Sequence, residues 1–282
     1  MIFWIASYPK SGNTWIRSLL CSYYYSEKGF FNQKLLGKIG QFPQKKYFTD
    51  FNYDKTKVTD TSKFWIKAQD KLNENNKLKF FKTHNALASI NGYQFTNIKN
   101  TIACIYIIRD PRNIVTSLKN HYEINYEDAL NFMLNEKKFI YDYHNQNDYS
   151  DFQFISSWQQ NYRSWINQTS FPVKIIKYED LHDKTFYVFK DIIKFINKIT
   201  NSKNSFNEKK ARNSVQSTSF DKLKNIEQTD GFQESILSKK NSKKIPFFHL
   251  GPKNDWRTIL NKDLKIKLEK LFEKELKELS YI

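Results

Sequence analysis

The sequence is 282 residues long and carries 46 lysine and arginine residues against 29 aspartate and glutamate residues, so its net charge of +17 favours anionic ligands. Its two cysteines, Cys21 and Cys104, are too few for a disulfide framework, and no apolar run approaches the roughly 20 residues of a membrane-spanning helix. A chain of this length can form one large α/β domain, so a single domain over residues 1–282 is expected.

A strand, a polar loop and a helix are predicted at the start of the chain. Ile2–Ala6 is short and apolar like a buried strand, and apolar residues from Trp15 onward recur at helical spacing. Backbone N–H groups and the helix dipole at such a junction favour an anion. The residues of the loop that can serve an anion are Lys10, Ser11, Gly12, Asn13 and Thr14. The nucleoside triphosphatase pattern G-x-x-x-x-G-K-[ST] is absent, so a phosphate-binding loop of another kind is predicted, the alternative being a turn with incidental polar residues.

A second apolar stretch, Phe80–Phe81, runs into Lys82, Thr83 and His84. The histidine is expected at the end of a strand, where an imidazole with an ordinary pKa of about 6.5 is suited to remove a hydroxyl proton. A structural histidine is the alternative.

The most apolar run of the chain, Thr101–Ile108, predicts a central strand that is buried on both faces. Arg109 follows this strand, Pro111 suits the first turn of a new helix, and Ser117 lies about two turns into that helix. Arg109 and Ser117 are therefore candidates to hold one phosphate from two sides, the alternative being an arginine that caps a helix and a serine on the surface.

Two further elements complete the predicted fold. Val173–Ile176 is a fourth apolar strand, and the leucines of Asp263–Leu279 recur near helical spacing, which predicts one amphipathic helix on the core. Strands that alternate with helical patterns indicate an α/β fold with a mainly parallel central sheet flanked by helices. Because ligands of such sheets bind beyond the carboxyl ends of the strands, Lys10, His84 and Arg109 are expected to converge there.

These motifs resemble those of the sulfotransferases that use 3′-phosphoadenosine 5′-phosphosulfate (PAPS), in their cytosolic and bacterial forms. Tyr8–Trp15 is similar to the family's Tyr-Pro-Lys-Ser-Gly-Thr-Thr-Trp loop for the 5′-phosphosulfate, with Asn13 in place of one threonine. Arg109 and Ser117 keep the family's spacing for contacts to the 3′-phosphate, and Lys82–His84 is similar to the tripeptide that ends in the catalytic histidine. The resemblance implies a P-loop-like nucleotide-binding core.

Other segments carry the resemblance into the second half of the chain. Tyr178 begins a Tyr-Glu-Asp element whose tyrosine lies near the nucleotide in the family. Thr218–Phe220 is similar to a segment that packs on the adenine, and Trp15 would supply the opposite stacking face, although a core tryptophan is the alternative.

The last motif departs from the family. Gly251–Arg257 resembles the loop that closes over the 3′-phosphate, but the family's Arg-Lys pair falls on His249 and Leu250. Lys253, or another cation nearby, is expected to compensate for the missing pair.

The resemblance also implies a mechanism. Lys10 and Lys82 would stabilise charge on the sulfuryl and bridging oxygens, and His84 would take the proton of the acceptor. Ser117 would restrain Lys10 until an acceptor arrives, which limits hydrolysis. Because a sulfuryl group carries less charge than a phosphoryl group, no metal is expected.

The acceptor is open between a small molecule, a lipid and a glycan. Phe30–Lys79 and Tyr122–Phe154 fall where the family places its acceptor loops, and they are rich in Phe and Tyr, which indicates either an aromatic pocket or core. The family's dimerisation element falls on Asn261–Lys262 without its Thr-Val centre, so a dimer of that type is not expected.

Location and the rival functions complete the predictions. Few cysteines, and a cofactor loop that follows Met1 too closely for a signal peptide, favour the cytoplasm. The lysines are scattered and form no recognised DNA-reading motif, so no nucleic-acid partner is expected. A P-loop-like kinase that uses ATP and a metal, and a basic nucleic-acid-binding protein, are the two alternative functions.

Overall fold

A five-stranded sheet is the centre of the fold, and its strands run in the order β2-β3-β1-β6-β9. The computed structural model describes residues 1–141, 147–238, 241 and 243–282. All neighbouring strands of this sheet are parallel, which confirms the predicted α/β architecture. The five strands are β1 (Ile2–Ser7), β2 (Gly40–Gln41), β3 (Lys79–Thr83), β6 (Thr101–Ile108) and β9 (Val173–Lys177).

Shorter strands and the helices complete the structure. The short antiparallel pairs are β4 (Ser89–Ile90) with β5 (Tyr93–Gln94), and β7 (Phe139–Ile140) with β8 (Gln153–Phe154). The α-helices are α1 (Asn13–Tyr25), α2 (Trp65–Asn73), α3 (Pro111–Tyr122), α4 (Tyr126–Leu134), α5 (Trp158–Ile166), α6 (Tyr178–Asp183), α7 (Thr185–Ile199), α8 (Glu208–Ser217), α9 (Phe220–Asp230), α10 (Trp256–Ile259), α11 (Lys262–Leu271) and α12 (Glu273–Glu278). The 3₁₀ helices are η1 (Gln33–Lys38), η2 (Lys45–Tyr47), η3 (Asp60–Phe64) and η4 (Gly251–Lys253).

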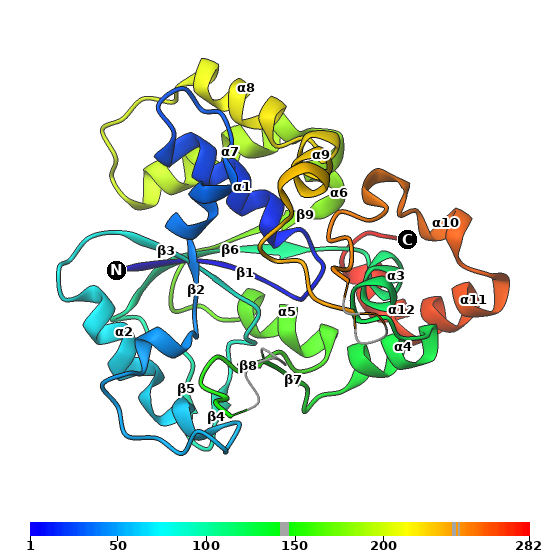
Figure 1. Ribbon diagram of the computed structural model, residues 1–282, viewed down its shortest axis with the longest axis horizontal. Helices are drawn as coiled ribbons and strands as arrows, with labels where there is room; N and C mark the ends of the chain where they lie inside the picture. Colours follow the sequence, from blue (N-terminus) through cyan, green and yellow to red (C-terminus); the bar gives the residue numbers. More distant parts are fainter. Residues whose placement is uncertain (142–146, 239–240, 242) are drawn as a thin grey trace.

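Both faces of the sheet are covered, as the continuous apolar character of the strands requires. Side chains of a strand point alternately to its two faces. Trp4 of β1 therefore joins one buried cluster, together with residues of α2 and α5, while Phe3 and Ile5 join a second cluster, which includes residues of α1 and α7. Figure 1 shows α1, α7 and α8 on one side of the sheet, and α2 and α5 on the other.

The strand order brings three polar loops together. β1 lies between β3 and β6, with Ala6 in register with Thr83 on one side and with Tyr106 on the other. Because all three strands are parallel, the segments that follow Ser7, Thr83 and Ile108 leave the same edge of the sheet, beside α3 in Figure 1.

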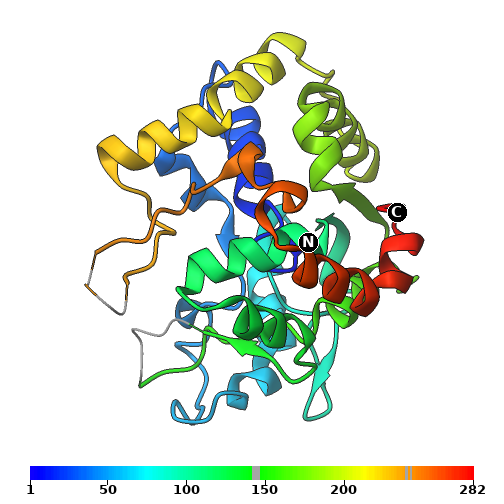
Figure 2. The ribbon, with the colours of Figure 1, turned by 90° about the vertical axis from the view of Figure 1, so that its right-hand side faces the viewer.

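The C-terminal helix differs from the prediction. Instead of one helix over Asp263–Leu279, the chain forms α11 and α12, with a break at Phe272, where the backbone has φ −113° and ψ 16°. The Phe272 side chain is fully buried beside Trp158, with their ring centroids 5.3 Å apart. Because the residue at the break is itself apolar and buried, the apolar repeat of the sequence continues through it. The sequence pattern alone therefore does not reveal that the helix is broken. Helix α11 packs against α3. Figure 2 shows α11 and α12 in orange-red to red at the right of the view.

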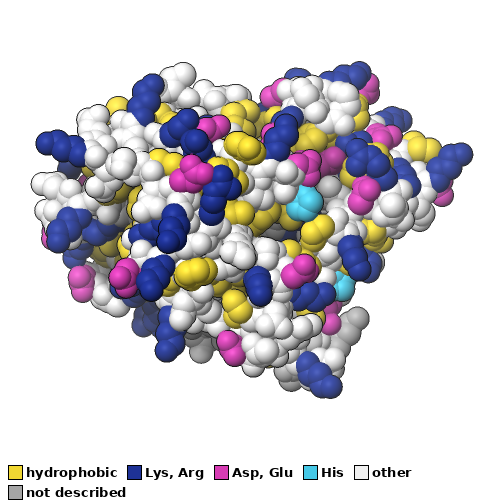
Figure 3. All heavy atoms as spheres, turned by 90° about the horizontal axis from the view of Figure 1, so that it is seen from above, with side chains coloured by type: hydrophobic (Ala, Val, Ile, Leu, Met, Phe, Trp, Pro, Cys, Tyr) yellow, Lys and Arg dark blue, Asp and Glu magenta, His cyan; other side chains and the backbone are white. Residues whose placement is uncertain are grey.

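The surface carries the positive charge in a dispersed form. Figure 3 shows Lys and Arg side chains spread over one face of the molecule, with Asp and Glu among them. No helix among the described residues is long and apolar enough to cross a membrane.

Candidate active site

The loop between β1 and α1 forms the floor of the site. Gly12 precedes α1 with φ 99°, and a Cβ atom there would lie 2.6 Å from Cδ2 of Tyr178, so the close approach of this ring requires glycine. The first turn of α1 contains no acidic side chain that would satisfy its N–H groups. Ser11 adds a buried hydroxyl without a hydrogen-bond partner among the described residues. The loop therefore presents unsatisfied donors, as an anion site does.

Asn13 also has a structural part in this loop. Its side-chain amide donates to the carbonyl of Ile5 at 2.9 Å and to the hydroxyl of Ser7 at 3.2 Å, so it fastens the loop to β1. Asn13 also lines the cavity of the site.

His84 directly follows β3, at the end of a strand as predicted. Its Nδ1 lies 2.7 Å from the carbonyl oxygen of Ser7. Because a carbonyl can only accept, Nδ1 carries the proton and Nε2 of the neutral ring is left as a base. Burial and the nearby charge of Lys82 lower the pKa of His84 to about 3, so the ring is neutral at pH 7.

Two lysines give the site its charge. Burial, followed by the positive charge of Arg109, lowers the pKa of Lys10 to about 7, although Glu234 acts in the opposite direction. The Lys10 ammonium lies 4.3 Å from the centre of the Phe247 ring. Burial also lowers the pKa of Lys82. An anion that binds beside these lysines would favour their charged forms and raise their pKa values.

Arg109 holds the other end of the site, after β6. Its guanidinium lies 4.1 Å from the centre of the Tyr178 ring, and Nη1 donates to the carbonyl of Lys10 at 2.9 Å and to the Ser117 hydroxyl at 3.4 Å. The Arg109 Nε is buried and without a hydrogen-bond partner in the part of the chain that the structure describes. The predicted pair, Arg109 and Ser117, is therefore brought together.

The Ser117 hydroxyl has a second neighbour that the motifs did not predict. The amide of Asn254 donates to Ser117 Oγ and to the carbonyl of Asn113, both at 2.9 Å. Asn254 also lines the cavity. Lys253 is exposed and is not among the residues that line the cavity.

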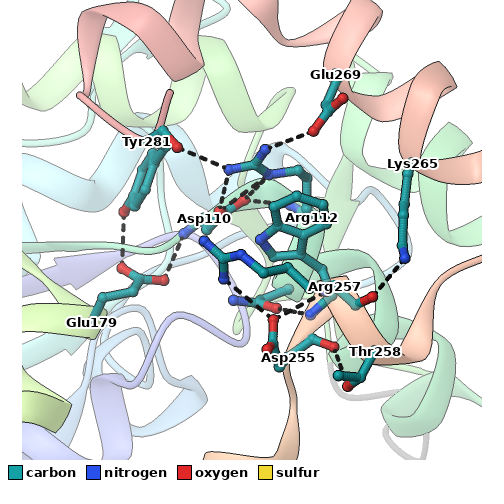
Figure 4. Close-up of polar contacts among 11 residues, drawn as sticks. Asp110, Arg112, Glu179, Asp255, Arg257, Thr258, Lys265, Glu269 and Tyr281 are labelled. Atoms are coloured by element: carbon teal, nitrogen blue, oxygen red, sulfur yellow. Dashed lines mark hydrogen bonds and ion pairs between the residues drawn. The ribbon is translucent and has the colours of Figure 1, made fainter.

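A polar network behind the strand end keeps Arg109 in place. Arg112 binds the carboxylate of Asp110 at 2.8 Å and that of Glu269 at 3.1 Å (Figure 4). Glu179 accepts from the backbone N–H of Asp110 at 3.1 Å and from the Tyr281 hydroxyl at 3.0 Å. Helix α11 and the C-terminal tail are thus joined to the turn that carries Arg109.

One cavity of about 1830 Å³ connects these groups. The predicted residues that line it are Lys10, Gly12, Asn13, Thr14, Trp15, Lys82, His84, Arg109, Ser117, Tyr178, Thr218, Phe220 and Gly251. Trp15 and Phe220 pack against the same small apolar cluster, and Trp15 also meets Tyr178 edge-on, with centroids 5.9 Å apart. A Cβ atom at Gly251, where φ is 52°, would lie 2.3 Å from the Phe220 ring.

The cavity is also lined by a mixture of side chains from outside the predicted donor motifs. Ring-bearing residues from the predicted acceptor segments are present, among them Tyr122, Phe132 and Phe139. Amides and a lysine lie with them: Gln41, Asn131, Asn135, Lys138 and Gln153. Because this cavity exceeds the roughly 300–1,000 Å³ of common small-molecule pockets, it has room for two substrates.

Two charged residues of the site escaped sequence analysis. Arg17 lies one turn after Thr14 on α1 and is only 5% exposed, and that spacing was a usable signal for a shared face. Glu234 follows α9 in a segment without helical or strand periodicity, and no sequence signal marked it. Its carboxylate binds Arg17 and accepts from the Thr14 hydroxyl at 2.5 Å.

Comparison with known proteins identifies the family of the chain. The sulfotransferase domain family matches residues 2–280. The chain is 22% identical to luciferin sulfotransferase of Photinus pyralis over 285 residues, which cover 99% of the chain and 72% of that protein.

Solved structures show the same fold. Mouse sulfotransferase SULT7A1, complexed with PAP, is similar with a TM-score of 0.56 and 19% identity, over 98% of this chain and 84% of that one. Retinol dehydratase, in a complex with retinol and PAP, is similar with a TM-score of 0.57 and 16% identity, over 98% of this chain and 81% of that one. The family match covers nearly the whole chain, and the chain therefore belongs to the sulfotransferase family of enzymes.

Proposed function

We propose that this enzyme transfers the sulfuryl group of PAPS to a hydroxyl or amine of an acceptor, with His84 as the base. The observation that carries the proposal is the convergence of the Lys10 loop, His84 and Arg109 at one edge of the sheet. Complexes of similar folds with PAP, the product that PAPS leaves behind, support it.

The donor would lie along the floor of the cavity. The N-terminus of α1, Thr14, and the Ser11 hydroxyl, which has no partner among the residues that the structure describes, suit the 5′-phosphosulfate, since each supplies a donor for an anion. Arg109 and Ser117 suit the 3′-phosphate, to which Nε of Arg109 can donate, since no described residue pairs with it. The ring of Tyr178 packs against this guanidinium. The adenine would lie near Trp15 and Phe220, which supply aromatic surface.

Residues beside His84 would carry out the transfer. The acceptor oxygen forms a bond to sulfur while the bond between sulfur and the bridging oxygen breaks, and PAP leaves. His84 Nε2 takes the proton of the acceptor. Lys10 and Lys82 stabilise the negative charge that develops on the bridging and sulfuryl oxygens. The arrival of the anionic donor raises the pKa of His84 from its low value, which makes the ring a stronger base.

We propose a small molecule, a lipid or a glycan as the acceptor. Rings and amides both line the cavity, which suits a hydroxyl compound with both apolar and polar groups. A cytoplasmic location is supported by Cys21 and Cys104, which are both buried and free. A single domain, the lack of a nucleic-acid partner and the lack of a family-type dimer stay predictions.

Replacement of His84 tests the assigned base. Asparagine can keep the hydrogen bond to the Ser7 carbonyl but has no basic nitrogen, so His84→Asn should lower sulfuryl transfer by about 10²–10⁴-fold. The affinity for PAP, measured by calorimetry, should stay within a few-fold of that of the unmodified enzyme. Transfer is measured with radiolabelled PAPS and a panel of phenols, alcohols and glycans. Transfer at an unchanged rate by His84→Asn would remove the histidine from this role.

A further inference from the structure

A carboxylate occupies the cationic centre of the site. Glu234 binds the Arg17 guanidinium, accepts from the Thr14 hydroxyl at 2.5 Å, and lies 3.8 Å from the Lys82 ammonium. The Arg17 and Lys82 side chains are only 6% and 12% exposed. Burial opposes ionisation of Glu234, but Lys82 and Arg17 outweigh it and hold the pKa of this carboxyl below its usual range. Glu234 is therefore charged at neutral pH.

The partners of Glu234 are the groups that a donor anion would use. Thr14 lies in the first turn of α1, where the helix dipole favours negative charge and no acidic residue of the helix itself is present. Lys82 stands two residues before His84, where the transferred group would lie under the proposed function. A carboxylate on these two groups takes the same interactions as a phosphosulfate.

Two anions cannot share these partners without cost. Like charges a few ångströms apart repel strongly in a site that is shielded from water. An incoming phosphosulfate must therefore displace the Glu234 carboxylate or bind against its charge. Arg17 has further anchors for its own part, because its Nη2 donates to the carbonyls of Leu36 and Ile39 at 3.2 and 2.8 Å. The guanidinium is thus held in place while its carboxylate partner changes.

We propose that Glu234 is an internal anion that competes with the donor and with PAP for Thr14, Lys82 and Arg17. This inference rests on the proposed function. Glu234 would thus be a residue that sets the affinity for the donor. After transfer, the return of its carboxylate to these groups helps expel PAP. The competition weakens donor binding and speeds turnover.

Removal of the charge at Glu234 tests the competition. Glu234→Gln keeps the shape of the side chain, and we expect it to bind PAP at least tenfold more tightly by calorimetry. Its PAP dissociation should slow and its KM for PAPS should fall, and kcat should also fall where product release limits the rate. The matched control is Glu208→Gln, which removes an exposed carboxylate paired with Arg212 on α8 and should leave the affinity for PAP unchanged.

A second variant covers the case in which Glu234→Gln folds poorly. Glu234→Asp keeps the charge but shortens the reach to Thr14, so it should bind PAP more tightly than the unmodified enzyme, though less tightly than Glu234→Gln. Equal or weaker binding of PAP by these folded variants, with normal binding by the unmodified enzyme, overturns the inference and leaves the proposed function standing.

Inorganic sulfate separates the two claims. If the unmodified enzyme and Glu234→Gln both fail to bind PAP, the proposed donor is wrong. The role of Glu234 as an internal anion is then tested by thermal unfolding. Sulfate should raise the Tm of Glu234→Gln more than it raises the Tm of the unmodified enzyme. An equal rise in Tm overturns the internal anion as well.

Discussion

Lys10 is the residue whose pKa most directly reflects the crowding of positive charge in the site. Its backbone has φ 65°, which is uncommon outside glycine, and its ammonium lies 4.3 Å from the centre of the Phe247 ring. Burial is the main cause of its pKa of about 7, and the positive charge of Arg109 adds to it. An anion bound beside Lys10 reverses this balance and raises the pKa again.

Proton uptake is the expected consequence. At pH 8 Lys10 is mostly neutral in the free enzyme, so binding of PAP should take up as much as one proton, and the affinity for PAP should fall as the pH rises above about 7. Calorimetry in buffers of different ionisation enthalpy measures the uptake. Lys10→Met should abolish most of it and weaken PAP binding about ten- to hundredfold, as the loss of a charge-assisted hydrogen bond does. A binding enthalpy independent of the buffer in the unmodified enzyme would refute this coupling.

Site residues could be predicted from the sequence where they directly follow a recognisable strand. Lys10, His84 and Arg109 each follow an apolar strand, and the structure gathers all three around one cavity. Glu234 and Asn254 enter the site from irregular segments, and Asn254 reaches Ser117 across 137 positions of the sequence. Such contacts depend on the tertiary fold and leave no periodic signal.

Among the elements, the β1–α1 unit shows how a turn sets the geometry of a site. Gly12 lets the Tyr178 ring lie against the turn, and that ring supports the Arg109 guanidinium at the other end of the site. The turn thus links the two groups proposed to hold the two phosphates.

A methyl group at Gly12 should break this link. Gly12→Ala places Cβ 2.6 Å from the Tyr178 ring, so the ring and Arg109 must shift, and PAP affinity should fall at least tenfold. Gly92→Ala is the matched control, because Gly92 also has a positive φ, of 84°, but has open space around its would-be Cβ. Both variants carry backbone strain of about 1–2 kcal/mol, seen as a lower Tm. Similar PAP affinities in the two variants would contradict the role given to Tyr178.

The elements were predictable to different degrees. The strands β1 and β6 follow from continuous apolar runs, because a buried parallel strand has no polar face. The strands β3 and β9 have shorter apolar runs that also contain lysines, and these runs were still sufficient to predict them. The two-residue strand β2 has no such run, and it exists because it pairs with β3 through Gly40 and Gln41. The break between α11 and α12 was not predicted because it depends on a tertiary contact, the packing of Phe272 against Trp158.

At the scale of the whole molecule, the strand order turns three separate motifs into one site. The loops after β3, β1 and β6 are neighbours because these strands are adjacent in the sheet. Helix α11 then secures the outer end, where Arg112 joins Asp110 to Glu269. The dispersed positive charge adds long-range attraction for an anion, and the cavity gathers the cationic side chains Lys10, Lys82 and Arg109.

Calorimetric titration of the unmodified enzyme with PAP and with adenosine 5′-phosphate tests this account most directly. PAP should bind at one site per chain. Adenosine 5′-phosphate, which lacks the 3′-phosphate assigned to Arg109, should bind about ten- to hundredfold more weakly, as expected for the loss of a charged hydrogen bond. No measurable binding of PAP, or equal affinity for the two nucleotides, would contradict the proposed site.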